Sequence, residues 1–501
     1  MVDVEKEFSG FGQPMRFEAD IRDCEVVGTI PPGLAGAYVK VGPMWYFPQM
    51  YPDDSGVNAD GYISMFRFRD GKVDFKSKWV KTERWKHDRA AHRQLYGKYR
   101  NPFTDDPSIR EQTIAQPWLR TTANTHTLAH AGKLFAIKED ALPYEIDPKT
   151  LETVGPWDFQ GQYDSRTFSA HNKIDPLSGE LLAYGYEATG LCSPDLYVYV
   201  MDSHGTVTKR WQLQVPEVRM IHDMAATQEH FIFPCGPYVT SLDWLKANNN
   251  HWGWDPSRPS MIGILPRRGS ASEVRWFKGK PRAMIHIINA RTDGNIVTLY
   301  AAHVDGAFAP FNGSFKSVDG SPLTATPALI RKYTFDLASS NDTYHEEVVW
   351  DVPVQDICRI DTRFMTVPNR YVFTGYNDSS KPFDTTRAGR AGRGVTNSYG
   401  RFDLETREVK SYFAGPTHSL AECCLVPRDS RNAVAMPSRG AAAEGDGYLI
   451  GMADNYAEMR TELVIADALD LEGGDIARVI LPFRTSGLHG LWIGGDEIDF
   501  G

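Results

Sequence analysis

"MFRFRDGKVDFKSKWV", residues 65–80, carries the pattern that decides the fold of this 501-residue chain. Apolar residues alternate with polar ones on both sides of a central turn, which is the period of a half-buried β-strand. They are Phe66 and Phe68 before the turn, then Val73, Phe75 and Trp79 after it, with Ser77 as a polar exception. Asp70-Gly71 supplies the two positive φ angles of a type I′ turn. The stretch therefore predicts a tight β-hairpin.

The same pattern recurs along the chain: a hydrophobic strand-like run leads into a turn that begins with Asp, and a second strand-like run follows the turn. Further examples are "FAIKEDALPYEIDPKTLETVG" (135–155), "NKIDPLSGELLAYGYE" (172–187), "YVMDSHGTVTKRWQL" (199–213) and "YGRFDLETREVKSYF" (399–413). Repeated hairpins predict an all-β fold, either a β-propeller or an array of β-sandwiches. No Pro/Ser/Gly-rich or charged linker divides the chain, so we expect one propeller domain over residues 1–501.

Three stretches break the hairpin pattern: residues 85–115, 240–260 and 305–325 are longer, aromatic and irregular. Insertions between the strands of a propeller gather over one face, where binding sites usually lie. We therefore expect a cap of loops and helices over that face.

Composition excludes several classes of partner. The formal net charge is −10 and the basic residues are scattered, which argues against nucleic-acid binding. No window approaches eighteen consecutive apolar residues, and the start "MVDVEKEFSG" lacks the apolar region of a signal peptide. The six cysteines form no CxxC pair, which favours a reduced chain in the cytoplasm.

Four of the fourteen histidines share an unusual setting at the edges of strand-like runs or between glycines: His171, His222, His286 and His489. Their wide spacing is wrong for a zinc finger but suits a site to which separate sheets each contribute one ligand. Neutral imidazole binds divalent iron, copper, nickel or zinc well. The alternative is that these are core histidines bonded to backbone carbonyls. Other histidines lie in polar segments and are expected to be exposed: His87, His92, His251 and His345.

Several ordered motifs together resemble the carotenoid cleavage oxygenase family, and within it the stilbene-cleaving branch. The motifs are "VVGTIPPGLAGAYVKVGP" (26–43), "TTANTHTLAHAGKLFAIKEDALPYEIDPKTLETVG" (121–155), "FSAHNKIDPLSGELLAYGY" (168–186), "MIHDMAAT" (220–227), "EGDGYLIGMADN" (444–455) and "GLHGLW" (487–492). The resemblance runs nearly end to end. It implies a seven-bladed propeller with a non-haem iron(II) ion on its axis, held by the four histidines named above.

The resemblance also implies carboxylates that orient the histidines. Glu139 in "IKED" and Glu422 in "AECCLVPR" match two of these positions. At the third position Asp356, in "DICRIDTRF", stands where the family has glutamate and is one methylene shorter. We therefore expect Asp356 to reach its histidine only through a shift or a water molecule. Gly487 and Gly490, on both sides of the last histidine, would let the backbone approach closely.

In the stilbene-cleaving branch, dioxygen splits the double bond of a 4-hydroxystilbene into two aromatic aldehydes, with no organic cofactor. Lys138 matches the branch's lysine at the phenol and separates this branch from carotenoid-cleaving members. At the branch's phenol-binding tyrosine the chain aligns Phe103, with Tyr96 and Tyr99 nearby. Tyr62 aligns with an aromatic residue that flanks the substrate, and Phe308 in "GAFAPFNGSF" is a candidate ring-stacking neighbour.

Two alternatives to this function stay open. One is an apocarotenoid-cleaving oxygenase, against which the polar stretch "YRNPFTDDPSIREQ" (99–112) argues, since a long polyene needs an apolar tunnel. The other is a propeller binding module without turnover, which would hold no iron. A homodimer is expected only by analogy with the family.

Overall fold

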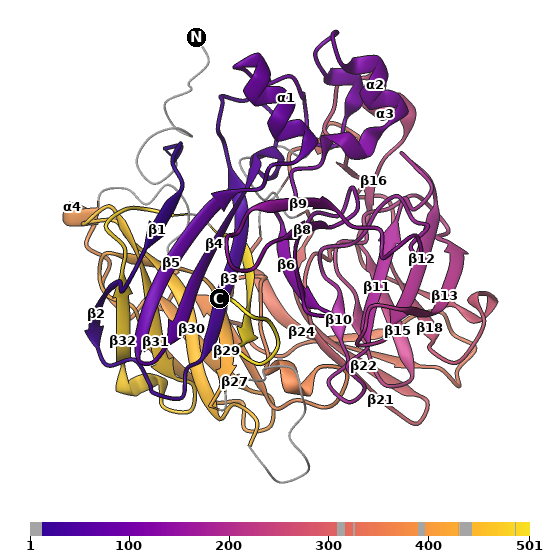
Figure 1. The fold of residues 1–501 in the computed structure, drawn as a ribbon. Helices are drawn as coiled ribbons and strands as arrows, with labels where there is room; N and C mark the ends of the chain where they lie inside the picture. Colours follow the sequence, from indigo (N-terminus) through magenta and orange to yellow (C-terminus); the bar gives the residue numbers. More distant parts are fainter. Residues whose placement is uncertain are drawn as a thin grey trace.

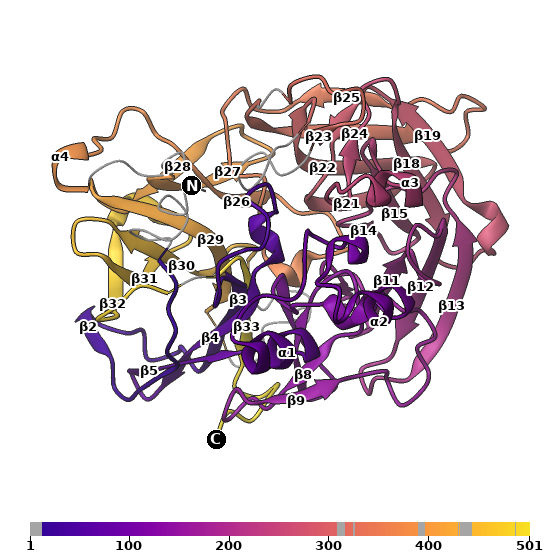
Figure 2. The ribbon, with the colours of Figure 1, turned by 90° about the horizontal axis from the view of Figure 1, so that it is seen from above.

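The structure is a computed structural model that describes residues 13–307, 316–323, 326–388, 396–428, 430, 443–485 and 487–501. Its described residues form eight β-sheets with four short α-helices, so the all-β prediction is confirmed. Seen from above, the sheets follow one another around the molecule in chain order (Figure 2). The number of propeller blades remains a prediction.

The hairpin predicted for residues 65–80 forms as expected. β4 (Asp60–Arg69) and β5 (Lys72–Trp79) pair antiparallel with Arg69 opposite Lys72. Asp70 and Gly71, the two residues of the turn, have φ angles of 52° and 74°, as a type I′ turn requires. The polar exception Ser77 is buried because its hydroxyl bonds that of Tyr62 at 2.7 Å.

The first half of the chain forms four sheets. In spatial order, the first sheet contains β1 (Ala19–Ile21), β5, β4, β3 (Gly36–Met44) and β33 (His489–Gly494), and the second contains β6 (His126–His130), β7 (Lys133–Ile137), β8 (Tyr144–Ile146) and β9 (Thr153–Pro156). The third sheet contains β10 (Lys173–Ile174), β11 (Leu181–Tyr186), β12 (Asp195–Met201) and β13 (Val207–Gln214). The fourth contains β14 (Ala225–Ala226), β15 (His230–Cys235), β18 (Ser260–Pro266) and β19 (Arg275–Gly279). The other predicted hairpins are among these pairs and in β27–β28 below.

The second half adds three large sheets and one small one. The first of these contains β20 (Arg282–Ala283), β22 (Ile296–Asp305), β24 (Ala328–Asp336) and β25 (His345–Val348), with β21 (Ile287–Asp293) beside β22. The second contains β26 (Tyr371–Tyr376), β27 (Ser398–Asp403) and β28 (Val409–Phe413), and the third contains β2 (Glu25–Gly28), β32 (Asp475–Ile480), β31 (Arg460–Asp467), β30 (Gly447–Asn455) and β29 (His418–Pro427). The small sheet contains β16 (Tyr238–Val239), β17 (Gly253–Trp254) and β23 (Lys316–Ser317).

The two ends of the chain are joined within sheets. β33 pairs with β3, and β2 pairs with β32. In the first pair Val41 lies opposite His489 and Lys40 opposite Gly490. A Cβ atom on Gly490 would lie 2.4 Å from Lys40 Cγ and 2.5 Å from the Val39 carbonyl oxygen. The glycine therefore permits the close strand approach that brings His489 into the interior.

The predicted insertions lie together above the sheets. α1 (Glu83–Ala91), α2 (Arg110–Ala115) and α3 (Leu242–Lys246) gather at the top of Figure 1, whereas α4 (Thr385–Ala388) lies apart from them. The Asn101 amide donates to the Leu245 carbonyl at 2.8 Å, and β17 pairs with β23 in parallel. Described residues of the three insertions are thus linked to one another by a side-chain hydrogen bond and a strand pair.

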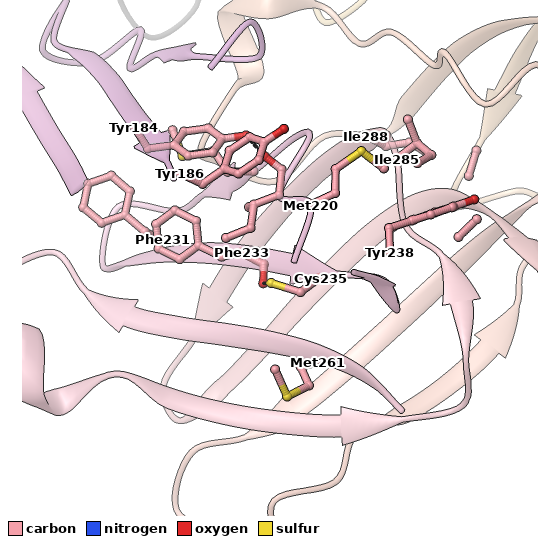
Figure 3. Packing of buried hydrophobic residues seen from close by; sticks show 14 of the residues in the cluster. Tyr184, Tyr186, Met220, Phe231, Phe233, Cys235, Tyr238, Met261, Ile285 and Ile288 are labelled. Atoms are coloured by element: carbon pink, nitrogen blue, oxygen red, sulfur yellow. Dashed lines mark hydrogen bonds between the residues drawn. The ribbon is translucent and has the colours of Figure 1, made fainter. Parts of the chain in front are cut away.

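The largest hydrophobic cluster joins successive sheets. Figure 3 shows Tyr184 and Tyr186 of β11 packed near Phe231 and Phe233 of β15, with Met220 between the sheets. Large buried aromatic side chains of this kind dominate the packing energy of a core.

The sequence predicted neither a membrane-spanning segment nor disulfide bonds, and the structure bears on both points. No helix within the described ranges is long and apolar enough to traverse a lipid bilayer. All six cysteines are free thiols.

The histidines predicted to be exposed do not all lie at the surface. His92 and His345 are exposed, whereas His87 is half-buried and bonds the Tyr96 hydroxyl at 2.7 Å. His251 has no exposed surface, so that prediction was wrong. The reason is a polar partner in the interior: its Nε2 lies 3.0 Å from the buried Glu187 carboxylate. A polar sequence context therefore did not mean exposure in this case.

Candidate metal centre

The four selected histidines meet at one point. Each lies at the start of an edge strand of a different sheet: His171 before β10, His222 before β14, His286 before β21, and His489 as the first residue of β33. One ring nitrogen from each lies within 4.8 Å of those of the other three. Their exposed fractions range from 1% to 8% for the three most buried, and His222 is partly buried. Distant parts of the sequence thus present four imidazoles to one small volume.

Three of the rings are held from behind by carboxylates. The Nδ1 atoms of His222, His286 and His489 lie 2.7, 2.8 and 3.0 Å from carboxylate oxygens of Glu139, Asp356 and Glu422, respectively. Bonding at Nδ1 leaves Nε2 to face the centre, and the buried Nε2 of His286 has no partner among the described residues. Asp356 reaches His286 directly, so the expected shift or bridging water is not needed.

Burial favours the neutral form of two of the four imidazoles, whereas at His222 the Glu139 carboxylate outweighs burial and raises the pKa. Burial lowers the pKa of His489 to about 3, although Glu422 opposes the shift. Burial and the neighbouring rings hold the pKa of His171 well below its ordinary value. Burial acts against ionised Glu139, but His222 and Arg100 outweigh it and bring the pKa of this carboxyl to about 2. The Glu139 carboxylate is therefore ionised at neutral pH and able to accept from the His222 ring N–H.

This donor set fits a divalent transition metal. Four imidazole nitrogens suit iron, copper, nickel or zinc, and hydrogen-bonded outer carboxylates are the usual support of histidine ligands. Within the described residues, no other group of His, Cys, Asp or Glu side chains converges in this way. The candidate ligands are thus the four histidines, with three carboxylates that fix their orientation.

Sequence reasoning missed a fifth histidine and an arginine beside the cluster. His126 begins the edge strand β6, and its ring centroid lies 5.4 Å from that of His489. Arg359 donates from Nη2 to His126 Nε2 at 3.0 Å and lies 2.7 Å from Glu422 Oε1. The signal that could have identified His126 is its position at the start of a strand, which it shares with the other four.

Lys138 is buried next to this site. It is 2% exposed, and its Nζ donates to Thr122 Oγ1 at 3.1 Å and lies 3.4 Å from Asp140 Oδ2. Burial lowers its pKa below the ordinary lysine value. The ring centroid of Tyr99 lies 5.1 Å from Lys138 Nζ. The Tyr99 hydroxyl donates to Glu139 Oε1 at 2.7 Å, so it bridges the lysine region and the histidine cluster.

The contacts of two further predicted substrate residues are with other side chains, and a third residue is outside the described ranges. Phe103 is half-buried in the cap, with Lys246 Nζ 5.9 Å from its ring centroid. Tyr62 is fully buried, packs edge-to-face on Trp79 and bonds Ser77. Phe308 lies outside the described residues. Of the aromatic candidates in the 95–107 stretch, Tyr99 is therefore the one that the fold brings to Lys138.

The fold and site place the chain in a family. The sequence profile described as retinal pigment epithelial membrane protein, RPE65, matches residues 12–494. The chain therefore belongs to the RPE65/carotenoid cleavage oxygenase family, as the sequence motifs indicated. It is similar to lignostilbene-α,β-dioxygenase isozyme III of Sphingomonas paucimobilis, with 37% identity over 98% of this chain and 97% of that protein. It is also similar to isoeugenol monooxygenase of Pseudomonas nitroreducens, with 38% identity over 96% of both chains.

Comparison with solved structures supports the same family assignment. The crystal structure of Pseudomonas brassicacearum lignostilbene dioxygenase matches with a TM-score of 0.89 and 34% identity, covering 98% of this chain and 99% of that one. A Synechocystis apocarotenoid oxygenase variant matches with a TM-score of 0.80 at 23% identity, over 96% of this chain and 97% of that one. The second likeness concerns the fold alone.

Proposed function

We propose that this chain is a non-haem iron(II) dioxygenase that cleaves the central C=C bond of 4-hydroxystilbenes to two aromatic aldehydes. The observation that carries the proposal is the meeting of four imidazoles next to a buried lysine, Lys138. The seven larger sheets would be the blades of a propeller over residues 1–501, with the metal on its axis. Bound iron(II) would supply the site that takes up dioxygen. The cytoplasm and a homodimer remain the expected location and assembly.

The histidines and their carboxylates would hold the metal. His171, His222, His286 and His489 would be the ligands, and Glu139, Asp356 and Glu422 would orient three of them through Nδ1. Outer hydrogen bonds of this kind fix the tautomer and the direction of the ring. Because all donors are neutral, the ion would keep its full positive charge.

Lys138 would activate the substrate. Burial lowers the pKa of Lys138, so a larger fraction of this amine is unprotonated than of an exposed lysine, and only the unprotonated amine can accept a proton. The phenol O–H proton would pass to Lys138 Nζ, which leaves an ammonium–phenolate pair in a dry site. The phenolate charge spreads through the ring onto the alkene, which makes the alkene a better reductant. Tyr99 would line this end of the site, because its ring lies beside Nζ.

The overall reaction balances without another reactant. One molecule of dioxygen adds one oxygen atom to each alkene carbon, and the C=C bond is replaced by two C=O bonds. The names of the relatives point to the same class of substrate, since lignostilbene and isoeugenol are both 4-hydroxyaryl alkenes. Apocarotenoid cleavage is the second candidate, which a likeness of fold and a 36% identical relative named carotenoid cleavage oxygenase 1 support.

The test is product analysis with labelled oxygen. Protein purified without oxygen is analysed for iron and then supplied with ¹⁸O₂ and resveratrol, isoeugenol or an apocarotenal. We expect about one iron per chain and two aldehydes from resveratrol, each with one ¹⁸O atom. Protein without stoichiometric iron would favour a binding module, and cleavage of the apocarotenal alone would favour the second candidate.

A further inference from the structure

A chain of buried contacts runs from the cap to one of the proposed metal ligands, and its central residue is Arg100. This side chain is 7% exposed, and its backbone has a φ of 50°, in the left-handed region. Its Nη2 lies 2.5 Å from Glu187 Oε2, and its Nη1 donates to the Tyr186 hydroxyl at 3.0 Å. The same Nη1 lies 3.6 Å from Glu139 Oε1. One guanidinium thus contacts the carboxylate that holds His222.

The cap fixes the position of Arg100. His251 Nε2 lies 3.0 Å from Glu187 Oε2, and its Nδ1 lies 3.1 Å from the Arg100 carbonyl oxygen. The guanidinium carbon is 5.4 and 5.6 Å from the ring centroids of Tyr186 and Trp252. A planar guanidinium held by a carboxylate and two aromatic rings has little freedom to move. His251 and Trp252 of the 240–260 insertion, together with Tyr186 and Glu187 at the end of β11, therefore hold the arginine in place.

Glu139 divides its two oxygens between the metal ligand and the cap. Oε2 faces His222 Nδ1, whereas Oε1 accepts from the Tyr99 hydroxyl and faces Arg100. A buried carboxylate without a neighbouring cation is costly, and it would turn toward another partner. That change would release the ring that it orients. The direction of the His222 ring thus depends on the cation behind Glu139.

We infer that Arg100, held by Glu187 and His251, is a positioning residue that sets the orientation of His222 through Glu139. The inference rests on the proposed metal role of His222. On this inference, the structural role of the buried His251 is to hold Glu187 against Arg100. It also predicts that the cap affects metal retention without contributing a ligand.

The experiment uses Co²⁺ loaded into the metal-free protein, because its visible absorption reports ligand geometry and no turnover is needed. Arg100→Gln is compared with wild type, with Arg100→Lys and with the control Arg331→Gln. Arg331 is also buried and paired to a carboxylate, Asp305 at 2.9 Å. We expect Arg100→Gln to lose cobalt to EDTA about 10 to 100 times faster, the usual effect of removing an outer-shell contact. Its absorption should change, Arg100→Lys should lie between, and the control should match wild type.

A double-variant comparison separates positioning from general destabilisation. If Arg100 acts through Glu139, Arg100→Gln should add no further acceleration in a Glu139→Gln background. Equal acceleration in both backgrounds, or an Arg100→Gln protein with wild-type absorption and cobalt retention, would overturn the inference. Thermal unfolding of the metal-free proteins identifies a variant that fails to fold, and Arg100→Lys then decides. Wild-type protein that binds no cobalt would instead overturn the proposed function, and this inference with it.

Discussion

Glu422 holds both the ring of His489 and the strand that carries it. One carboxylate oxygen lies 3.0 Å from His489 Nδ1, and the other accepts from the backbone N–H of Gly490 at 2.9 Å. Arg359 also lies 2.7 Å from this carboxylate, which is fully surrounded by protein. A single buried group therefore couples the fold of the last strand to the direction of one proposed ligand.

Glu422→Gln should weaken iron(II) binding about 10- to 100-fold, because an amide cannot satisfy the ring, the backbone N–H and Arg359 together. Competition with a chelator under anaerobic conditions measures the change. The matched control is Glu462→Gln, since Glu462 bonds His418 at 3.1 Å outside the four-histidine group. Equal loss of affinity in both variants would contradict a specific role for Glu422.

Asp356→Glu restores the residue type that the resemblance leads one to expect, yet it should weaken metal binding. Asp356 already bonds His286 at 2.8 Å, so the backbone is placed for the shorter side chain. An added methylene would push the carboxylate past the ring or bend its side chain away from a favoured rotamer. The same competition assay applies. Unchanged or tighter binding would show that the site accommodates either length.

Lys138→Met should lower turnover of resveratrol by at least about 100-fold while leaving iron content unchanged. In the variant the phenol must ionise without help, so its rate should rise steeply with pH toward the ordinary phenol pKa of about 10. The wild type should depend less on pH near neutrality, because burial lowers the pKa of Lys138 and lets the amine accept the proton. Initial rates from pH 6 to 10 test this. A 4-methoxystilbene should be processed poorly by both proteins.

Much of this architecture could be predicted because it depends on local periodicity. Alternating residues and the Asp70-Gly71 turn fix the β4–β5 hairpin, and these signals lie within sixteen residues. The four histidines could be selected because each stands at the edge of a strand. Their convergence could be expected only from the family resemblance, since contacts such as His489 with Glu422 depend on how whole sheets are arranged.

The polar interior could not be predicted. His251 and Arg100 lie in polar, irregular stretches of sequence, which predict exposed side chains. Both side chains are nevertheless buried, because both contact the Glu187 carboxylate in the interior. Tyr99 and Phe103 are four residues apart in one loop, and only the fold decides which of them faces Lys138. Side-chain direction in irregular segments has no periodic signal, so such contacts must come from the structure.

Gly490→Ala should displace His489 and lower both the unfolding temperature and iron retention. The added Cβ would meet the Val39 carbonyl oxygen at 2.5 Å, a backbone atom that cannot move without opening the β3–β33 pair. Gly71→Ala is the control, because there only the left-handed φ of 74° is strained and no heavy atom lies within 4 Å. Its cost should be about 1–2 kcal/mol, with iron retained. Iron retention in Gly490→Ala equal to the control would contradict the close-approach argument.

Asp88→Asn should change how stability depends on pH. Burial raises the pKa of Asp88 to about 7 although Arg84 opposes the shift, and an aspartate in the unfolded chain titrates near 3.9. Between these values the folded protein keeps a proton that the unfolded chain has lost, so stability falls as pH rises through this window. Asparagine cannot ionise, and its side-chain oxygen can still accept from the Leu95 N–H. Between pH 5 and 8 the wild type should therefore lose roughly 2–3 kcal/mol of unfolding free energy relative to the variant. Urea denaturation at both pH values measures this difference, and parallel pH dependence in the two proteins would show that Asp88 is ionised in the folded state.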